Sequence, residues 1–400
     1  MKRATAGATS LLNIGMVAAF RQRNTMKGNT PFMAFYGNAA NGSQTMFEDS
    51  ATDVQISLIQ NTAKIADWGE RGVSSPVGID ARYFNGESGN IVTRAFPIIK
   101  GFGTITAKDT TFKTPSGAYL PKQERTQIMI ELGREQGANA ALSHVMRHEY
   151  MAAEGILTGK VTVSSAGGQF DFKRHTDNTF TVAKVWTDTT STPRKDIGTA
   201  CRRTHLNGKA KPDACFMSND MFDAWLVHTE TTALADIRRY DITFVGSQGM
   251  AELGSDARYR RFIDAGWMPR AVTSVEGGYR LVIFTTLATY TDKNGVDQDL
   301  MPASTSFVAA TTGRFDRYFG PDDKMPGFYE KSAGRAQELF GIAQTGAGLI
   351  TAEAGELFDA RMLKFFVTEA TDGGSVKIEA QSAPIYAPVQ ANAICVFKEP

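Results

Sequence analysis

A run over residues 121–159 is the strongest constraint on what this chain can fold into. Pro121 opens the run at a favoured first-turn position, and no later proline interrupts it. Apolar residues recur at helical spacing from Ile128 to Leu157, and Gly159 marks a C-terminal stop. At about 1.5 Å per residue such a helix spans roughly 50 Å. The rest of the fold must therefore extend beside it.

Composition limits the class of protein. The chain has 400 residues, 42% of them hydrophobic, which is enough to bury a sizeable core. Its formal net charge is only +1, so the chain as a whole has no strong electrostatic attraction for nucleic acid or an acidic membrane. Three cysteines without a C-x-x-C pair fit a reduced, cytoplasmic site of assembly. No apolar run reaches the roughly 18 residues of a membrane span.

Residues 1–50 do not have the pattern of a compact unit. They carry basic residues but no acid before Glu48, and their apolar residues gather in knots such as Phe32-Met33-Ala34-Phe35-Tyr36. Two interpretations remain open: a flexible tail, or an arm that becomes ordered only against neighbouring subunits, because these aromatic side chains are unfavourable in solvent. We interpret the basic residues as a solvated face rather than as a nucleic-acid site.

Residues 68–108 are rich in turn-forming residues between short strand-like pieces at 79–84 and 91–96. Asn85-Gly86 is a strong two-residue hairpin signal. The sequence therefore predicts a long two-stranded ribbon over 68–108. An isolated ribbon is marginal in water, and its edges invite pairing with another chain. Two arrangements of this ribbon are equally favoured. It packs on its own domain as a hairpin, or it extends across a neighbouring subunit.

Strands and helices alternate irregularly along the rest of the chain, which indicates a mixed α+β fold. The predicted strands cover residues 53–59, 161–163, 169–172, 180–186, 214–217, 279–284, 306–310 and 393–397. The predicted hairpins cover 288–300, with a turn at Asn294-Gly295, and 363–381, about Asp372-Gly373-Gly374. The predicted helices cover 197–206, a segment capped by Ser218-Asn219-Asp220, and a segment from Ser255 to Phe262.

Patterns for catalysis and metal binding are weak. His144 and His148 stand four residues apart on the predicted long helix, next to Glu149, and could share a metal ion. The order H-x-x-x-H-E differs from H-E-x-x-H, so we interpret the histidines as a solvated or interface pair. Nucleophile-elbow, phosphate-loop and dinucleotide-binding signatures do not occur. The sequence predicts no catalytic residue, no metal and no cofactor, and hence no enzyme.

Basic and aromatic residues are the candidates for contacts between subunits. The predicted ribbon supplies some of them, and clusters of arginine further along the chain supply the others. These clusters lack interleaved stacking aromatics, which favours ion pairs between subunits over nucleic-acid binding. The candidates are Arg82, Tyr83, Phe84, Arg94, Phe96, Arg238, Arg239, Arg258, Arg260 and Arg261.

Three stretches of the chain resemble the major capsid proteins of tailed double-stranded DNA phages, the family that includes the lambda major capsid protein. The first is EYMAAEGILTGKV at 149–161 with QFDF at 169–172. The second is the hairpin from YTDKNG at 290–295 to DLMP at 299–302, and the third is AQSAP at 380–384. They follow one another in family order, and the resemblance covers most of the chain.

The resemblance implies an α+β fold of the Hong Kong 97-like capsid type, with an extended β-hairpin loop, a long spine helix and an axial α/β domain. The implied divisions are an N-terminal arm over 1–52, an extended loop over 53–109, a peripheral domain over 110–192 with the spine helix at 121–159, an axial domain over 193–355, and C-terminal strands over 356–400 that return through the peripheral into the axial domain.

The implied function is that of a structural protein. It would self-assemble as hexamers and pentamers into an icosahedral capsid shell around phage genomic DNA, and would reside in the virion after assembly in the host bacterial cytoplasm. The implied partners are further copies of itself, a separate scaffolding protein, a portal protein, a decoration protein at threefold sites and packaged DNA in non-specific contact, with no membrane. An encapsulin-like non-viral shell is the alternative, and a soluble α+β enzyme is less favoured.

Two features support these partners. About 50 residues precede the predicted ribbon, too few for a built-in scaffold, so a separate scaffolding protein is implied. Residues 79–90 contain no lysine for the covalent cross-link that some family members form. Uncross-linked shells often carry a decoration protein, which is why one is expected here.

Overall fold

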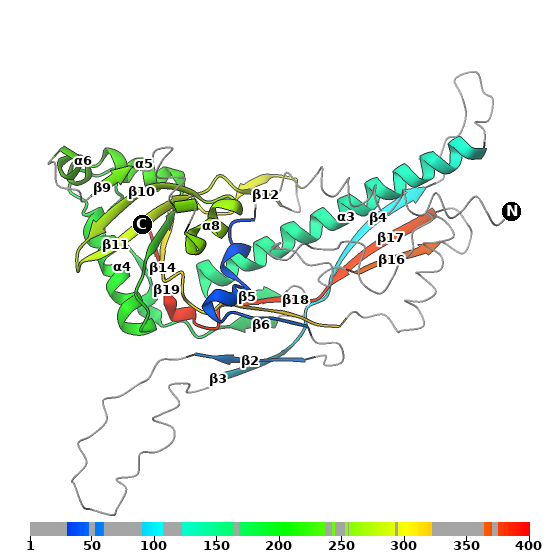
Figure 1. Cartoon of the computed structure of the whole chain (residues 1–400), viewed down its shortest axis with the longest axis horizontal. Helices are drawn as coiled ribbons and strands as arrows, with labels where there is room; N and C mark the ends of the chain where they lie inside the picture. The colour runs from blue at the N-terminus through cyan, green and yellow to red at the C-terminus, as the bar shows by residue number, and fades with distance from the viewer. Residues whose placement is uncertain are drawn as a thin grey trace, which may run out of the picture.

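The computed structural model shows an elongated molecule with a broad end and a narrow end (Figure 1). The structure describes residues 30–47, 53–59, 90–106, 122–163, 168–236, 242–244, 253–254, 256–292, 295–321, 364–369 and 375–400. Helices and strands of mixed direction make up both ends, so the predicted α+β class is confirmed. No helix of these residues is long and apolar enough to cross a membrane.

The long helix α3 (Lys122–Thr158) runs from the narrow end into the broad end (Figure 1). It confirms the helix predicted over 121–159, to within one residue at each end. The helix stops at Gly159, which has a left-handed φ of 72°. The buried guanidinium of Arg174 then donates to the carbonyl oxygens of residues 155–157. A cation therefore satisfies the free carbonyls of the last turn.

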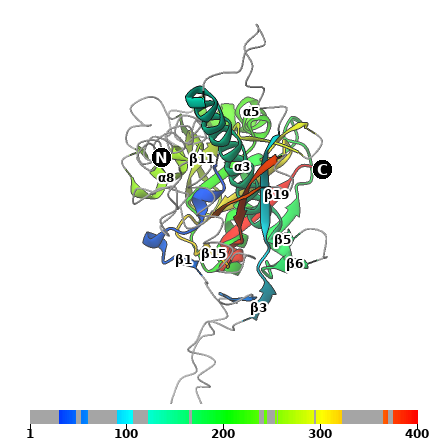
Figure 2. The ribbon, with the colours of Figure 1, turned by 90° about the vertical axis from the view of Figure 1, so that its right-hand side faces the viewer.

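A three-stranded antiparallel sheet lies along α3 at the narrow end (Figures 1 and 2). Its strands are β16 (Lys364–Glu369), β17 (Ser375–Ser382) and β4 (Ile99–Thr106), in that order. The hairpin predicted over 363–381 is confirmed as β16 and β17. The last strands of the chain then lead from β17 into the broad end.

The prediction of a ribbon over 68–108 is wrong for its last part. Residues 99–106 pair with the C-terminal strand β17 instead. Glycines allow this strand to lie close against α3, because a Cβ atom at Gly103 would stand 2.6 Å from Cβ of Gln136. No packing role was predicted for the glycines at 101 and 103, and in the structure they serve close packing against α3.

A two-stranded antiparallel pair lies beside the body of the molecule (Figure 1). It joins β2 (Asp53–Leu58) to β3 (Asn90–Ala95). Both strands were predicted, but β3 was expected to pair with residues 79–84, which lie outside the described residues together with Asn85-Gly86. Alternate residues of β2 are buried and exposed. The inner face of the pair therefore packs on its own subunit.

A seven-stranded mixed sheet forms the broad end. Its order is β7 (Thr179–Thr181), β19 (Ile394–Lys398), β14 (Thr305–Ala309), β8 (Ala214–Met217), β11 (Tyr279–Thr285), β10 (Met268–Val275) and β9 (Ile242–Phe244). One face packs against α4 (Pro193–Gly208) and α5 (Asn219–Val227), and α6 (Thr229–Asp236) packs against these two helices. The other face packs against α8 (Ala257–Asp264), the N-terminal arm and the end of α3.

Most of the predicted elements of the broad end are present, with local differences. The strand predicted over 180–186 ends at Thr181, and Trp186 is buried in the turn that follows, where its Nε1 donates to Asp196. Asp256 rather than Ser255 caps α8, since its carboxylate accepts from the backbone N–H of Arg258. Ser255 lies outside the described residues.

Smaller elements connect the two ends. The remaining strands are β1 (Thr45–Phe47), β15 (Asp316–Phe319) and β18 (Pro384–Ala387) in one sheet, β5 (Lys160–Val163) with β6 (Gly168–Asp171), and β12 (Thr289–Thr291) with β13 (Asp297–Asp299). Short 3-10 turns are η2 (Met33–Phe35), η3 (Ala39–Asn41), η4 (Thr176–Asn178) and η6 (Ala391–Ala393). The predicted hairpin over 288–300 is confirmed as β12 and β13.

Candidate functional site: the arm joint

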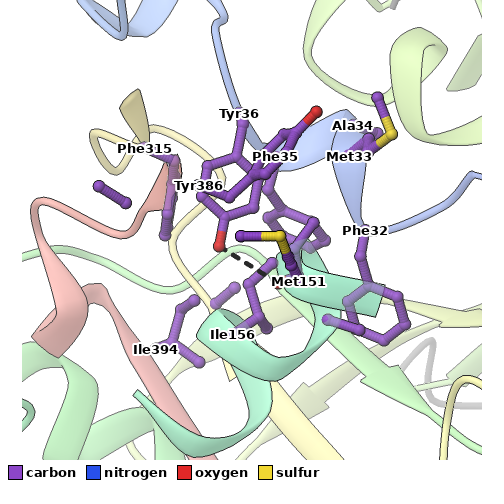
Figure 3. Packing of buried hydrophobic residues seen from close by; sticks show 14 of the residues in the cluster. Phe32, Met33, Ala34, Phe35, Tyr36, Met151, Ile156, Phe315, Tyr386 and Ile394 are labelled. Carbon is purple, nitrogen blue, oxygen red and sulfur yellow. Dashed lines mark hydrogen bonds between the residues drawn. The ribbon is translucent and has the colours of Figure 1, made fainter. Parts of the chain in front are cut away.

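Residues 32–36 of the arm fill the centre of the larger hydrophobic core (Figure 3). Each of the five is at most 2% exposed. The ring of Phe35 lies 4.9 Å from that of Phe216 on the sheet and 4.7 Å from that of Phe262 on α8. Of the two interpretations left open for residues 1–50, neither holds for residues 32–36, which are neither a flexible tail nor ordered only against neighbouring subunits. They are buried in their own subunit, at the place where α3, α8 and the sheet meet.

Glu149 of α3 holds the backbone of this knot. Its fully buried carboxylate accepts from the N–H of Phe32 at 2.6 Å and from the N–H of Met33 at 2.9 Å. These donors begin the 3-10 turn η2 and have no partner within it. Burial raises the pKa of Glu149 to about 8, against the opposing effect of the two N–H bonds. The arm is thus attached to the helix through a carboxyl group and two backbone amides.

Three further hydrogen bonds attach the knot to α8 and the strand after it. Trp267 Nε1 donates to the carbonyl of Pro31 at 2.8 Å, and Thr30 N–H donates to the carbonyl of Ala265 at 3.2 Å. Arg261 Nη2 donates to the carbonyl of Tyr36 at 3.1 Å. Burial lowers the pKa of Arg261 to about 10. The partly buried guanidinium of Arg261 therefore lies at the end of residues 32–36.

The chain after the knot is held by charged groups of β15. A Cβ atom at Gly37, where φ is +70°, would stand 2.5 Å from Nε of Arg317, so glycine leaves room for this side chain. Arg317 Nε donates to Thr45 Oγ1 at 2.6 Å. Buried Asp316 accepts from the N–H of Gln44 at 2.8 Å. Side chains therefore hold the arm along its length from residue 30 to residue 47.

His144 and His148 form a second buried polar group on α3. The hydroxyl of Ser382 lies 2.8 Å from His144 Nδ1 and 2.9 Å from His148 Nε2. The other ring nitrogens face the carbonyl of Ala380 and the hydroxyl of Tyr386. Burial lowers the pKa of His144 to about 4 and lowers the pKa of His148 as well, so both rings are neutral near pH 7.

The prediction of a solvated or interface pair is therefore wrong for these histidines. They connect α3 to the C-terminal strands inside one subunit, and every ring nitrogen has a protein partner. Within the described ranges, no three metal-ligating side chains gather at one point.

The structure places the predicted contact residues in different environments. Arg258 is exposed and pairs with Asp256 at 2.7 Å, while exposed Arg260 pairs with Asp264 at 3.7 Å. Arg261 is turned inward to the arm, as described above. Phe96 is buried against Gly320, where a Cβ atom would overlap its ring.

The other candidates can be placed only in part. Arg94 stands in β3 opposite Val54. The rest lie outside the described residues: Arg82, Tyr83, Phe84, Arg238 and Arg239. The role of all these residues in contacts between subunits stays a prediction.

Glu149, Ser382 and Asp316 were not predicted as functional or structural anchors. Glu149 was considered only as a metal ligand beside His148, although an acid in the middle of an apolar helical stripe signals a buried partner. Ser382 and Asp316 gave no signal, because Ser382 meets His144 across 238 positions of sequence and Asp316 meets Gln44 across 272.

Comparison with known proteins decides the family. The family model of phage major capsid protein E matches residues 50–332. The chain belongs to this family. It is therefore a structural protein of a phage capsid shell, which self-assembles from many copies and resides in the virion. A search of the curated proteins finds no match.

The fold is the Hong Kong 97-like fold of phage capsid proteins, and a solved structure with a TM-score above 0.5 supports it. A candidate capsid protein of a prophage of E. coli CFT073 is similar with a TM-score of 0.54 and 15% identity, over 96% of this chain and 97% of that chain. A phage-related protein of Bordetella bronchiseptica RB50 has a TM-score of 0.44 and 11% identity, over 97% and 96%. A virus-like particle from Pyrococcus furiosus has a TM-score of 0.37 and 9% identity, over 93% and 98%.

Proposed function

We propose that this capsid protein assembles as hexamers and pentamers into an icosahedral shell that encloses the phage genome. The observation that carries the proposal is the pair β2–β3. In the described part of the chain it pairs with no third strand, and residues 60–89 connect its two strands. A two-stranded pair is marginal alone, and its outer edges are open to another chain.

The proposed roles of the chain segments follow the elongated shape. The broad end, within residues 193–355, meets further copies around the axes of hexamers and pentamers. The narrow end, with α3 and its three-stranded sheet, forms the peripheral part of each subunit. Within 53–109, the open edges of β2–β3 contact a neighbouring copy, while residues 99–106 stay paired with β17 of their own subunit. Residues 1–29 precede the anchored part of the arm.

The proposed partners are those of a shell that is built empty and then filled. A separate scaffolding protein directs assembly in the host cytoplasm, and a portal protein occupies one vertex. A decoration protein binds at threefold sites, because residues 79–90 lack a lysine for a covalent cross-link. Packaged DNA contacts the inner wall without sequence specificity, as the net charge of +1 suits.

Electron microscopy of the expressed chain tests this proposal, both alone and with the neighbouring reading frames of its genome. Closed icosahedral particles made of hexamers and pentamers are expected. Tubes or a stable monomer under all conditions would contradict the proposal. Particles that form without any second protein and enclose a protein cargo would favour an encapsulin-like shell instead.

A further inference from the structure

The outer face of α4 carries a line of positive charge. Lys195 and Arg202 stand seven residues apart, so they lie about 10 Å from each other along the same side of the helix, and Lys209 follows directly after its last residue. All three are exposed, and in the residues that the structure describes none has an acidic group within salt-bridge distance. Leu206 lies on the same line and is 51% exposed. We call these four residues the basic stripe.

The outer face of α5 carries the opposite charge. Asp220 and Asp223 are exposed one helical turn apart, and within the described ranges neither has a basic partner. Val227 follows on the same side and is 75% exposed. The opposite side of α5 is buried through Met221, Phe222 and Trp225. We call Asp220, Asp223 and Val227 the acidic stripe.

Each stripe therefore combines charges of one sign with one large exposed apolar side chain. Only seven large apolar residues of the described chain are exposed, and the stripes contain two of them. A contact between two such surfaces would bury the apolar side chain of each and leave the charges at its rim, as in other protein interfaces. The charges of the two stripes are complementary, so a surface that fits one of them exists on every copy of this chain.

The position of the helices allows this contact between copies. Figure 1 looks down the shortest axis of the molecule, and α5 lies at the upper margin of the broad end while α4 lies at its left and lower margin. No salt bridge of the described residues joins the two stripes within one subunit. The stripes can meet head to tail, the margin of one copy against the other margin of the next, and such contacts close into rings.

We infer that the basic stripe of one subunit binds the acidic stripe of the next subunit in the ring. The inference rests on the proposed assembly into hexamers and pentamers and names the surfaces that join neighbouring copies. Leu206 and Val227 are buried in the contact, and the basic side chains pair with the aspartate side chains beside them. The charges fix the direction of the contact, since two basic stripes or two acidic stripes repel each other.

Reciprocal charge reversal tests the contact. We expect Arg202→Glu with Lys209→Glu, and separately Asp220→Lys with Asp223→Lys, to reduce the fraction of assembled protein at least about tenfold through like-charge repulsion. The chain with all four changes should assemble to within about threefold of the original, because the pairs are restored in reverse. Lys398→Glu with Arg280→Glu, at two exposed positions on other surfaces, is the matched control and should assemble normally. Sedimentation and electron microscopy measure the assembled fraction, and circular dichroism checks folding.

Cysteine cross-linking gives a second readout that does not depend on reversed charges. The three native cysteines are buried. In particles of the chain with Leu206→Cys and Val227→Cys, oxidation or a short bis-maleimide should produce a ladder of covalent multimers. Each single cysteine variant should produce no such ladder.

Three results would overturn the inference. One is normal assembly of either reversed pair, and another is the absence of cross-links in assembled particles of the double-cysteine chain. The third is normal assembly of Arg202→Glu with Lys209→Glu together with loss of bound DNA, which would assign the basic stripe to nucleic acid. In each of these results shells still form, so the proposed function stands. Failure of the unaltered chain to assemble would instead overturn the proposed function.

Discussion

The N-terminal arm and the β2–β3 pair are both extended limbs in sequence, yet they relate to the subunit in opposite ways. Residues 32–36 of the arm are buried on all sides, and their leading N–H groups bond to Glu149. β2 buries only alternate residues and leaves Gln55 and Ser57 in solvent. The arm at 32–36 is buried on all sides, whereas the pair contributes only one face to the same core, through Val54, Ile56 and Leu58.

This difference shows what allows an extended segment to be buried in its own subunit. Apolar side chains can be buried only if the backbone polar groups beside them find partners. The arm finds such partners in Glu149, Trp267 and Arg261, each on another element. The pair β2–β3 satisfies its backbone between its own two strands and keeps two outer edges. We therefore expect the arm to contribute more to subunit stability than the pair, whose exposed face and edges remain for the proposed contacts with another copy.

The largest effect is expected from removing an arm ring. Phe35→Ala should lower the free energy of unfolding of the unassembled subunit by about 3–5 kcal/mol, through lost burial and the cavity left between Phe216 and Phe262. Urea unfolding measures this. A change below about 1 kcal/mol would break the comparison, because the arm would then not belong to the core.

A smaller effect is expected at the carboxyl group that holds the arm. Glu149→Leu should cost about 2–4 kcal/mol, because it leaves the buried N–H groups of Phe32 and Met33 without an acceptor. Glu149→Gln keeps a carbonyl oxygen in place and should cost less. Equal losses in the two variants, measured by urea unfolding, would show that hydrogen bonding to the arm is not the cause.

Ser382→Ala should cost about 1–3 kcal/mol, because it removes the hydroxyl that His144 and His148 share. Thermal unfolding measures the loss, and Ser143→Ala on the exposed side of α3 is the matched control. This result would sharpen the comparison by showing that the C-terminal strands, like the arm, are held to α3 by buried polar groups. No change in stability would show that the two histidines need no partner there.

The pH dependence of stability should separate Glu149 from the histidines. The pKa of Glu149 in the folded chain, about 8, lies above its ordinary value of 4.5. The contribution of this carboxyl group to the free energy of unfolding is therefore complete below pH 4.5 and is lost as the pH rises through 8. Between pH 7 and 8.5 we expect the free energy of unfolding to fall by about 1 kcal/mol more in the native chain than in Glu149→Gln.

The buried cysteines lower stability at high pH in both chains, so only the difference between the chains reports on Glu149. His144 and His148, with lowered pKa values, act below pH 6.5 and in the opposite direction, because their protonation favours the unfolded chain. Parallel pH profiles of the native chain and Glu149→Gln from pH 7 to 8.5 would contradict the assignment.

The smallest effect is expected on the outer face of β2. Gln55→Ala should change the stability of the unassembled subunit by less than about 0.5 kcal/mol, because the side chain is exposed. Urea unfolding of the unassembled protein, next to Phe35→Ala, measures the contrast. A loss comparable to that of Phe35→Ala would mean that the pair is as deeply embedded as the arm.

Local patterns determined much of this protein. The apolar stripe and stop signal over 121–159 predicted α3 almost to its ends, and the turn residues Asn294-Gly295 and Asp372-Gly373-Gly374 predicted two hairpins. Ser218 was predicted as a helix cap and accepts from the N–H of Met221. These features depend on residues that are close in sequence, where propensity and periodicity act directly. The order of such elements also carried the resemblance to the phage capsid family.

Tertiary structure alone decided where the limbs go and which polar groups are buried. The composition of residues 32–36 is equally compatible with packing on their own subunit and with packing on a neighbour. Their placement depends on Glu149, 117 positions away from Phe32, and on a hollow formed by three distant elements. The pairing of residues 99–106 with β17 likewise depends on room that two glycines leave beside α3. Contacts of this kind depend on shape and hydrogen-bond partners in space, which a local sequence pattern does not record.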